Sequence, residues 1–284
     1  MKENDEKSEK LKQLVRNKYS EIAEQSKETN ASACCGATGC CTVDAAVMAD
    51  DYTQLDGYVP EADLGLGCGL PTEFAKISEG DTVVDLGSGA GNDCFVARSL
   101  TGEKGSVIGI DFTEKMIEKA TANADKLGYG NVEFIHGDIE KLPLDNEVAD
   151  VVVSNCVLNL VPDKRKAFAE TYRVLKNGGH FSVSDIVIEG DLPDDLQKAA
   201  EMYAGCISGA IQKEQYLDIV KGAGFENLSL QKQKAIVLPD EILLQYIPAQ
   251  EIAQFRSRSK ILSITLYGEK PSQKTTCCSP ECCN

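Results

Sequence analysis

The glycine-rich loop at residues 87–91 constrains the fold of this chain more than any other stretch. It follows the apolar, β-branched run Val83-Val84-Asp85-Leu86 and precedes the helical spacing of Phe95, Val96 and Leu100. An apolar run that breaks into glycines before a helical pattern indicates a strand, a tight turn and a helix. Glycine reaches backbone conformations that a Cβ obstructs, so a ligand can lie against main-chain N–H groups at the helix N-terminus. We therefore expect the opening unit of a nucleotide-binding α/β fold.

The spacing of the glycines separates two kinds of nucleotide site. Asn92 stands where the dinucleotide pattern G-x-G-x-x-G needs its last glycine, which argues against pyrophosphate binding. About twenty residues beyond the loop, the usual separation for a ribose-binding acid, a second apolar strand at 107–110 ends in Asp111. Its carboxylate can accept hydrogen bonds from both hydroxyls of a ribose. Loop and acid together predict a nucleoside site.

The loop from Asp85 to Gly91, taken with Asp111, resembles that of the class I S-adenosylmethionine-dependent methyltransferases. The resemblance implies that Asp85 supports the loop, that Asp111 binds the ribose and that Met116 lies beside the adenine. In the turn after the third strand, Asp138 would accept from the adenine amino group and the Ile139 N–H would bind a ring nitrogen. The donor-binding residues expected on this basis are Asp85, Gly87, Ser88, Gly89, Asp111, Met116, Asp138, Ile139 and Asn155.

Length, charge and hydropathy narrow the choice of partners. A chain of 284 residues can form one large or two modest domains. The net charge of -16 argues against nucleic acid, because binding to phosphates needs Lys and Arg. No apolar run reaches membrane-spanning length and the N-terminus shows no signal-peptide pattern. We expect a cytoplasmic monomer that acts on a small molecule.

Twelve cysteines in a chain without an export signal favour thiol chemistry or soft-metal binding over a disulfide framework. Eight are paired near the two ends and four stand singly. Cys94, beside Phe95 and Val96, is expected to be a small packed residue. Cys68, Cys156 and Cys206 fall in glycine-bounded or strand-terminal loops, and we expect them to be accessible and directed toward one crevice. The paired cysteines are Cys34, Cys35, Cys40, Cys41, Cys277, Cys278, Cys282 and Cys283.

The alternation of strand and helix patterns predicts a parallel sheet with helices on both faces. Strands are expected at 82–86, 106–111, 132–136, 149–154 and 181–186, and helices at 10–24, 92–101, 114–127 and 163–176. Beyond Glu189 we expect helices at 194–205 and 213–223 and strands at 227–230, 235–238 and 261–266. These form a smaller α+β cap over the carboxyl edge of the sheet.

The fold class predicted from this pattern is therefore α/β, a Rossmann-like class I methyltransferase sheet with a C-terminal α+β cap and a disordered cysteine-rich tail. The domains expected are an N-terminal helix with cysteine-bearing loops at 1–70, the donor-binding domain at 71–188, the cap at 189–270 and the tail at 271–284.

Three single thiols near one crevice suit trivalent arsenic, which is soft and thiophilic and takes three sulfur ligands. The segments around Cys68, Cys156 and Cys206, with the glycine loop, resemble those of the arsenite S-adenosylmethionine methyltransferases over roughly residues 31–224. The resemblance implies that these thiols hold arsenite or its thiol conjugates, with Cys40 the best match to a further family cysteine. It also implies S-adenosylmethionine as donor, thioredoxin or glutathione as reductant, and no structural metal.

Two other classes of protein stay open at this point. A methyltransferase of a small organic molecule, such as a quinone-type carbon methyltransferase, would share the donor loop and have no use for the thiols. A thiol-rich protein that sequesters metal would explain the paired cysteines, but it would leave Gly87, Gly89 and Asp111 without a role.

Overall fold

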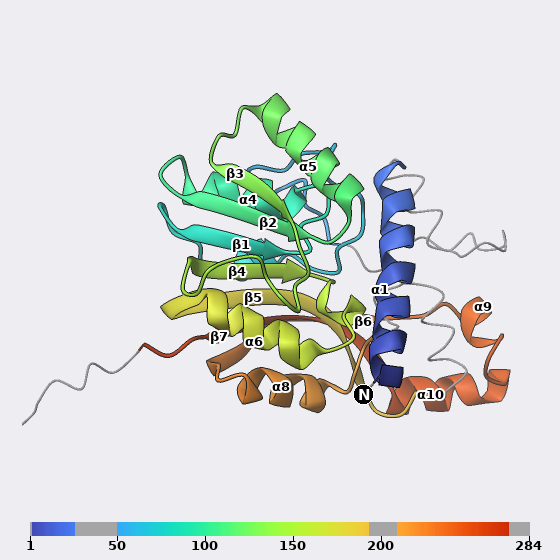
Figure 1. The fold of residues 1–284 in the computed structure, drawn as a ribbon. Helices are drawn as coiled ribbons and strands as arrows, with labels where there is room; N and C mark the ends of the chain where they lie inside the picture. Colours follow the sequence, from blue (N-terminus) through green and yellow to red (C-terminus); the bar gives the residue numbers. More distant parts are fainter. Residues whose placement is uncertain (1, 26–49, 193–208, 273–284) are drawn as a thin grey trace, which may run out of the picture.

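The structure, a computed structural model, describes residues 2–25, 50–192 and 209–272. Within these ranges the chain forms one seven-stranded sheet flanked by helices (Figure 1). The strands are β1 (Thr82–Leu86), β2 (Ser106–Asp111), β3 (Val132–His136), β4 (Ala149–Asn155), β5 (Leu175–Glu189), β6 (Glu226–Ile236) and β7 (Lys260–Glu269). The helices are α1 (Lys2–Ala23), α3 (Pro71–Phe74), α4 (Asn92–Thr101), α5 (Glu114–Leu127), η2 (Leu158–Leu160), α6 (Lys164–Val174), α8 (Lys213–Gly222), α9 (Asp240–Leu243), η3 (Ala249–Glu251) and α10 (Ile252–Arg258).

The strand order places a ligand crevice at the centre of the sheet. The order is β3-β2-β1-β4-β5-β7-β6, in which β1 to β5 are parallel and β7 runs antiparallel to both of its neighbours. The direction of winding reverses between β1 and β4, and open α/β sheets bind ligands outside the carboxyl ends of the strands at such a reversal. The glycine loop follows β1 and Cys156 follows β4, so both leave the sheet at this point.

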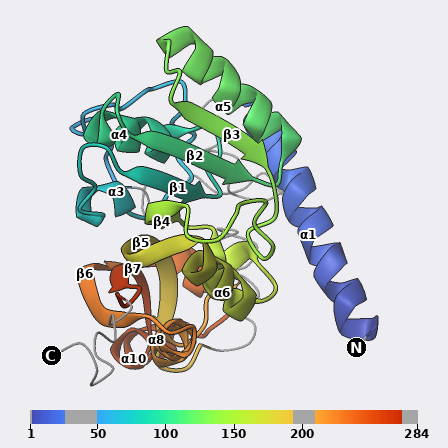
Figure 2. The ribbon, with the colours of Figure 1, turned by 60° about the vertical axis from the view of Figure 1, so that its left-hand side comes forward.

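The central strands are buried on both faces, which explains their continuous apolar runs. On one face, Val84 of β1 packs in a cluster with Phe168 of α6 and Val220 of α8. On the other face, Val83 packs with Cys94 of α4. Helices α4 and α6 accordingly lie on opposite sides of the sheet (Figures 1 and 2).

The segment from β1 to β3 agrees with the sequence prediction at every boundary. Its boundaries are marked by local signals, since Gly91 begins α4 with φ +98° and Gly128 ends α5 with φ +68°. Both angles are in the left-handed region, where glycine is favoured.

Other boundaries differ from the predictions. Helix α1 begins at Lys2 although apolar spacing starts only at Leu11, because Lys and Glu are themselves good helix formers. Helix α6 ends at Val174, and β5 is a 15-residue strand because its residues 180–189 pair with the whole of β7.

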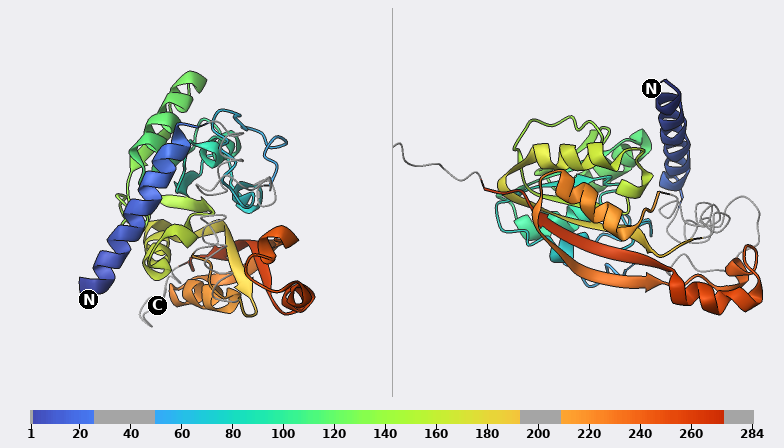
Figure 3. Two further views of the ribbon diagram at one scale, coloured as in Figure 1. Left: turned by 90° about the vertical axis from the view of Figure 1, so that its right-hand side faces the viewer. Right: turned by 90° about the horizontal axis from the view of Figure 1, so that it is seen from below.

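The two strands predicted at 227–230 and 235–238 are one strand, β6, and the prediction of a break was wrong. The polar residues 231–234 between them are tolerated because β6 is an edge strand with largely exposed side chains. Strands β6 and β7 extend the central sheet, so the prediction that these strands belong to a separate cap was wrong. The segment 240–258 projects beyond the carboxyl edge of the sheet (Figure 3, right).

Several predictions fall outside the described residues. They concern Cys40 and the other paired cysteines, Cys206, the helix at 194–205 and most of the tail. Among the helices that the structure describes, none has the length and apolar character needed to cross a membrane.

Candidate active site

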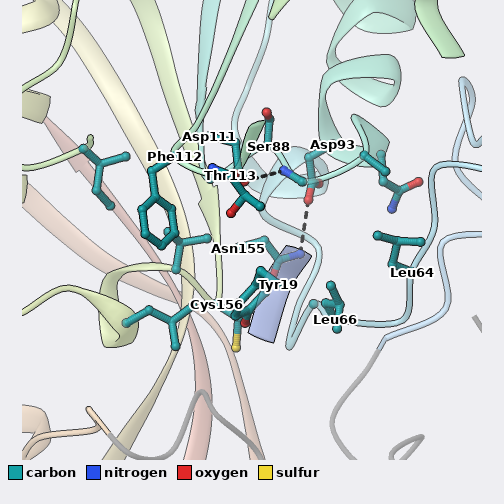
Figure 4. Close-up of a pocket in the computed structure, with 18 of the residues that line it drawn as sticks. Tyr19, Leu64, Leu66, Ser88, Asp93, Asp111, Phe112, Thr113, Asn155 and Cys156 are labelled. Atoms are coloured by element: carbon teal, nitrogen blue, oxygen red, sulfur yellow. Dashed lines mark hydrogen bonds between the residues drawn. The ribbon is translucent and has the colours of Figure 1, made fainter. Parts of the chain in front are cut away.

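A cavity opens at the carboxyl edge of the sheet, between the loops that follow β1 to β4 (Figure 4). Helix α1 crosses this edge and contributes Lys12 and Tyr19 to the lining (Figure 3, left). Of the residues predicted to bind donor or substrate, those that line the cavity are Gly87, Ser88, Gly89, Asp111, Asp138, Ile139, Asn155 and Cys156. The sequence thus located one site built from four separate loops.

The glycine loop provides space rather than hydrogen-bond donors. Gly87 has φ +73°, and a Cβ there would lie 2.4 Å from a methyl carbon of Val157. Gly89 has φ +51°, and a Cβ there would meet no protein atom within 4 Å. The expected free main-chain donors are already used, because the N–H groups of Gly87 and Ser88 bind the Ile110 carbonyl at 2.7 and 2.9 Å.

Two side-chain oxygens in this loop fit a polar ligand. Ser88 Oγ and Asn92 Oδ1 are buried, line the cavity region and have no hydrogen-bond partner among the described residues. Buried polar groups are nearly always hydrogen-bonded, so a pair of unpartnered oxygens marks a position where a bound molecule completes the bonding.

Asp111 is fixed at the end of β2 by two main-chain donors. One carboxylate oxygen accepts from Gly89 N at 3.0 Å and the other from Thr113 N at 2.8 Å. Burial raises the pKa of Asp111, and these N–H groups oppose the shift. Each oxygen has two acceptor positions, so the carboxylate can still accept from the hydroxyls of a ribose.

Helix α1 contacts the adenine side of the predicted donor site. Lys12 Nζ lies 2.6 Å from Asp138 Oδ2 and also pairs with Glu140. Partial burial lowers the pKa of Lys12, but the bonds to Asp138 and Glu140 outweigh it, so the net shift is upward and Lys12 is a cation. The carboxylate predicted to bind the adenine amino group is therefore already engaged by α1.

Three aromatic side chains in the lining, those of Phe112, Tyr19 and Tyr52, were not predicted from the sequence. Phe112 follows Asp111 directly and carries the Arg16 guanidinium 5.5 Å above its ring. Tyr19 shares a helix face with Lys12, since seven residues make two turns. That shared face was the signal available in the sequence. Met116 does not line the cavity: it is fully buried in a cluster with Ile22 and Phe95.

The structure brings Cys68 and Cys156 together in one apolar cluster that includes Ile186 and Leu243. Cys156 lines the cavity, and so does Gly67 beside Cys68. The prediction of accessible thiols was wrong for two of the three, because Cys68 is 0% and Cys156 is 2% exposed. The cap segment supplies the cover, since Leu243, Ile247 and Ile252 belong to the same cluster.

Cys156 has an unusual backbone and Cys94 an ordinary one. Cys156 adopts φ +61°, and its N–H donates to the Ser184 carbonyl at 2.8 Å. Cys94 is buried as predicted, with its Sγ 3.3 Å from Asp85 Oδ2. Burial, together with the neighbouring Asp93, raises the pKa of Asp85 well above its usual value.

The side-chain amide of Asn155, which also lines the cavity, joins two protein loops. Its Oδ1 accepts from Cys68 N at 3.0 Å, and its Nδ2 donates to the Gly69 carbonyl at 2.8 Å and to Asp93 at 3.2 Å. Asp93 also accepts from the Tyr52 hydroxyl (Figure 4 shows Asp93 and Asn155).

Asp93 and Tyr52 were not identified from the sequence. Burial raises the pKa of Asp93 to about 6, although the bonds from Tyr52, Asn155 and Thr72 lower it. Asp93 was visible as the residue after the turn into α4. Tyr52 carried no local signal, because it lies 41 residues from Asp93 in the chain.

No candidate metal site was found in the part of the chain that the structure describes. There, no group of three or more His, Cys, Asp or Glu side chains could hold a metal ion. The third predicted arsenic ligand, Cys206, is outside that part.

Comparison with known proteins agrees with this fold and site. Residues 77–224 match the family described as a methyltransferase domain, and with the seven-stranded sheet this defines a Rossmann-like class I methyltransferase. The chain is 36% identical over 278 residues to the arsenite methyltransferase of Halobacterium salinarum, covering 93% of this chain and 68% of that protein. The chain belongs to the arsenite methyltransferase family.

The chain is also similar to two further proteins, over different shares of its length. The crystal structure of an arsenic(III) S-adenosylmethionine methyltransferase from Chlamydomonas reinhardtii superposes with a TM-score of 0.60 at 35% identity, covering 78% of this chain and 71% of that one. The ubiquinone/menaquinone biosynthesis C-methyltransferase UbiE of Escherichia coli is 34% identical over 135 residues, which is 46% of this chain and 52% of that protein. The likeness to the quinone enzyme thus covers half as much of the chain as the likeness to the arsenite enzyme.

Proposed function

We propose that this protein transfers the methyl group of S-adenosylmethionine to trivalent arsenic held by cysteine thiolates. The observation that carries the proposal is that one cavity has donor-binding residues on one side and a cysteine thiol on the other. The cavity is lined by Asp111 and the glycine loop on one side and by Cys156 on the other, and Cys68 shares the apolar cluster of Cys156.

The donor side would hold the nucleoside through Asp111 and the ring of Phe112. Ser88 Oγ and Asn92 Oδ1 would gain hydrogen bonds that the described protein does not supply. When bound, S-adenosylmethionine would supply an electrophilic methyl group, to which the lone pair on trivalent arsenic donates as the sulfur–methyl bond breaks and the thioether leaves. The burial of Cys68 and Cys156 keeps water away from this end of the cavity.

The thiol side would bind arsenite by condensation. Each thiol that binds replaces one As–O bond by an As–S bond, and its proton leaves with the hydroxide as water. Soft thiolates are the preferred ligands for such a centre. We propose Cys206 as the third ligand. Methyl transfer formally oxidises arsenic to the pentavalent state, and a pair of thiols that includes Cys40 would reduce it again by forming a disulfide, which thioredoxin or glutathione returns to thiols by exchange.

The setting of the reaction is part of the same proposal. A cytoplasmic location suits a reaction that needs reduced thiols, and we expect a monomer. We propose a division into an N-terminal segment at 1–70, a donor domain at 71–188, a C-terminal part at 189–270 and a tail at 271–284. Within 189–270, β6 and β7 continue the sheet of the donor domain, and the segment 240–258 would act as the cap, since its Leu243, Ile247 and Ile252 pack with the thiols.

One reaction tests the proposal. Purified protein is incubated with radiolabelled S-adenosylmethionine, arsenite and excess thiol, and the arsenic species are separated chromatographically. We expect label in methylated arsenicals. Arsenite bound without labelled product would identify a sequestering protein. A parallel incubation replaces arsenite with a quinol, and label on the quinol with none on arsenic would identify the quinone-type alternative.

A further inference from the structure

Three buried side chains from distant parts of the chain meet beside the cavity. The Tyr52 hydroxyl lies 3.0 and 2.9 Å from the two carboxylate oxygens of Asp93. The Asn155 amide donates to Asp93 Oδ2 at 3.2 Å and also to the Tyr52 oxygen. Burial and the neighbouring Asp93 raise the pKa of Tyr52, so its hydroxyl remains a donor. We call these three residues the Tyr52–Asp93–Asn155 clamp.

The clamp is bonded to the backbone on both sides of the first thiol. Asn155 Oδ1 accepts the N–H of Cys68 at 3.0 Å, and the Gly69 carbonyl lies 2.8 Å from Asn155 Nδ2 and 3.1 Å from the Tyr52 hydroxyl. A Cβ on Gly67 would lie 2.7 Å from Asn155 Nδ2. The loop that carries Cys68 is therefore pressed against the amide of Asn155.

The clamp is covalently joined to the second thiol, because Asn155 directly precedes Cys156. A single amide thus connects the backbones of both cysteines, and Asp93 with Tyr52 fixes the orientation of that amide. Hydrogen bonds to an ionised group are stronger than those between neutral groups, so the carboxylate is suited to this task.

We propose that the Tyr52–Asp93–Asn155 clamp sets the spacing of Cys68 and Cys156, which makes Tyr52 and Asp93 positioning residues for arsenic binding. The inference rests on the proposed function, since it assigns a role to residues around the same thiols. Two sulfur atoms held at the correct spacing bind one arsenic atom without the entropy cost of ordering two loops.

The test measures chelation of arsenic rather than turnover. Phenylarsine oxide takes up two thiols, forms two As–S bonds and releases one water. The parent for this test is the full-length chain in which the paired cysteines and Cys206 are serine, so that Cys68 and Cys156 are the pair available beside the buried Cys94. Affinity for phenylarsine oxide and affinity for S-adenosylmethionine are each measured by calorimetry.

The informative variant is Tyr52→Phe, with Tyr216→Phe as a matched control. Tyr216 is also buried, and its hydroxyl bonds a buried carboxylate, Asp185, at 3.1 Å. Tyr216 lies within electrostatic range of Cys68 and Cys156, but it makes no bond in the clamp and does not line the cavity, so it is a stringent control. We expect Tyr52→Phe to weaken phenylarsine oxide binding by about tenfold, the effect of one lost hydrogen bond to a charged group. Tyr216→Phe loses a hydrogen bond that is not part of the clamp, so its affinity for phenylarsine oxide should stay within about twofold of that of the parent.

Three outcomes separate the ideas. Equal arsenical affinity for Tyr52→Phe and Tyr216→Phe overturns the clamp and leaves the proposed function standing. Failure of the parent to bind, or unchanged binding in Cys68→Ser, overturns the thiol pair itself. If Tyr52→Phe fails to fold, Asp93→Asn decides the question. An amide at position 93 has one acceptor oxygen fewer and turns an N–H toward the hydrogen-bond donors of Tyr52 and Asn155. Unchanged affinity of Asp93→Asn for phenylarsine oxide would again refute the clamp.

Discussion

The donor side and the thiol side of the cavity are built in different ways. On the donor side, the bonds that fix Asp111 come from Gly89 and Thr113, 22 and 2 residues away in the chain. On the thiol side, the backbone of Cys68 is held by Asn155 and Ser263, 87 and 195 residues away. The carboxylate of Asp111 is thus held by bonds of short sequence range, whereas the backbone of Cys68 is held only when the whole sheet has assembled.

This difference predicts that the two sides fail separately. A change in the thiols should leave the donor site intact, since none of the bonds that fix Asp111 involves a cysteine. A change in Asp111 should leave the thiols able to bind arsenic. Three substitutions test that independence.

The largest effect is expected from Cys156→Ser. Ser and Cys pay the same cost at φ +61°, so the substitution changes the sulfur and little else. We expect arsenite methylation to fall by about a hundredfold or more, the scale of losing a group that contacts the reacting atom. Calorimetry should show that Cys156→Ser binds S-adenosylmethionine as tightly as the parent does. Methylation near the parent rate would refute a role for this thiol.

A smaller effect is expected from Asp111→Ala. The change removes the acceptor for Gly89 N and Thr113 N as well as the proposed ribose contact. Donor affinity should fall by about tenfold to a hundredfold, which corresponds to one or two hydrogen bonds to a charged group. Binding of phenylarsine oxide should be unchanged. Loss of both affinities together would mean that the two sides are coupled, and unchanged donor affinity would exclude Asp111 from the site.

The smallest effect is expected from Lys12→Ala. The ion pairs to Asp138 and Glu140 are partly exposed, and such pairs contribute a few tenths to 1 kcal/mol. We expect donor dissociation, followed by stopped flow, to become about threefold faster. High salt should have a similar effect on the parent and little on Lys12→Ala. If neither Lys12→Ala nor high salt changes the dissociation rate, α1 does not restrain the donor.

The same contrast explains what the sequence could predict. From β1 to β3 every boundary was correct, because glycines with positive φ and apolar periodicity act within a few residues of where they occur. The position of Asp111, the burial of Cys94 and the convergence of Cys68 with Cys156 also followed from the pattern and the expected topology.

The errors arose where distant segments meet. The burial of Cys68 and Cys156 depends on residues 243–252, and β6 is continuous because β7 pairs with it. The bonds of the Asn155 amide to Gly69, Cys68 and Asp93 were likewise not predicted, whereas its contact with the methyl donor stays a prediction. No pattern near residue 155 encodes partners that lie 62 to 87 residues away.

The left-handed backbone at Cys156 has a consequence for descendants and relatives of this chain. At φ +61° most side chains are disfavoured, while Gly, Asn and Asp are tolerated. A homologue that keeps this turn after the fourth strand but has abandoned thiol chemistry should therefore carry one of those three residues, rather than Ala or Val, at this position. The residue at position 156 is therefore a marker. Cysteine there indicates that the thiol is retained at a steric cost, and glycine, asparagine or aspartate indicates that the turn is kept although the thiol chemistry is lost.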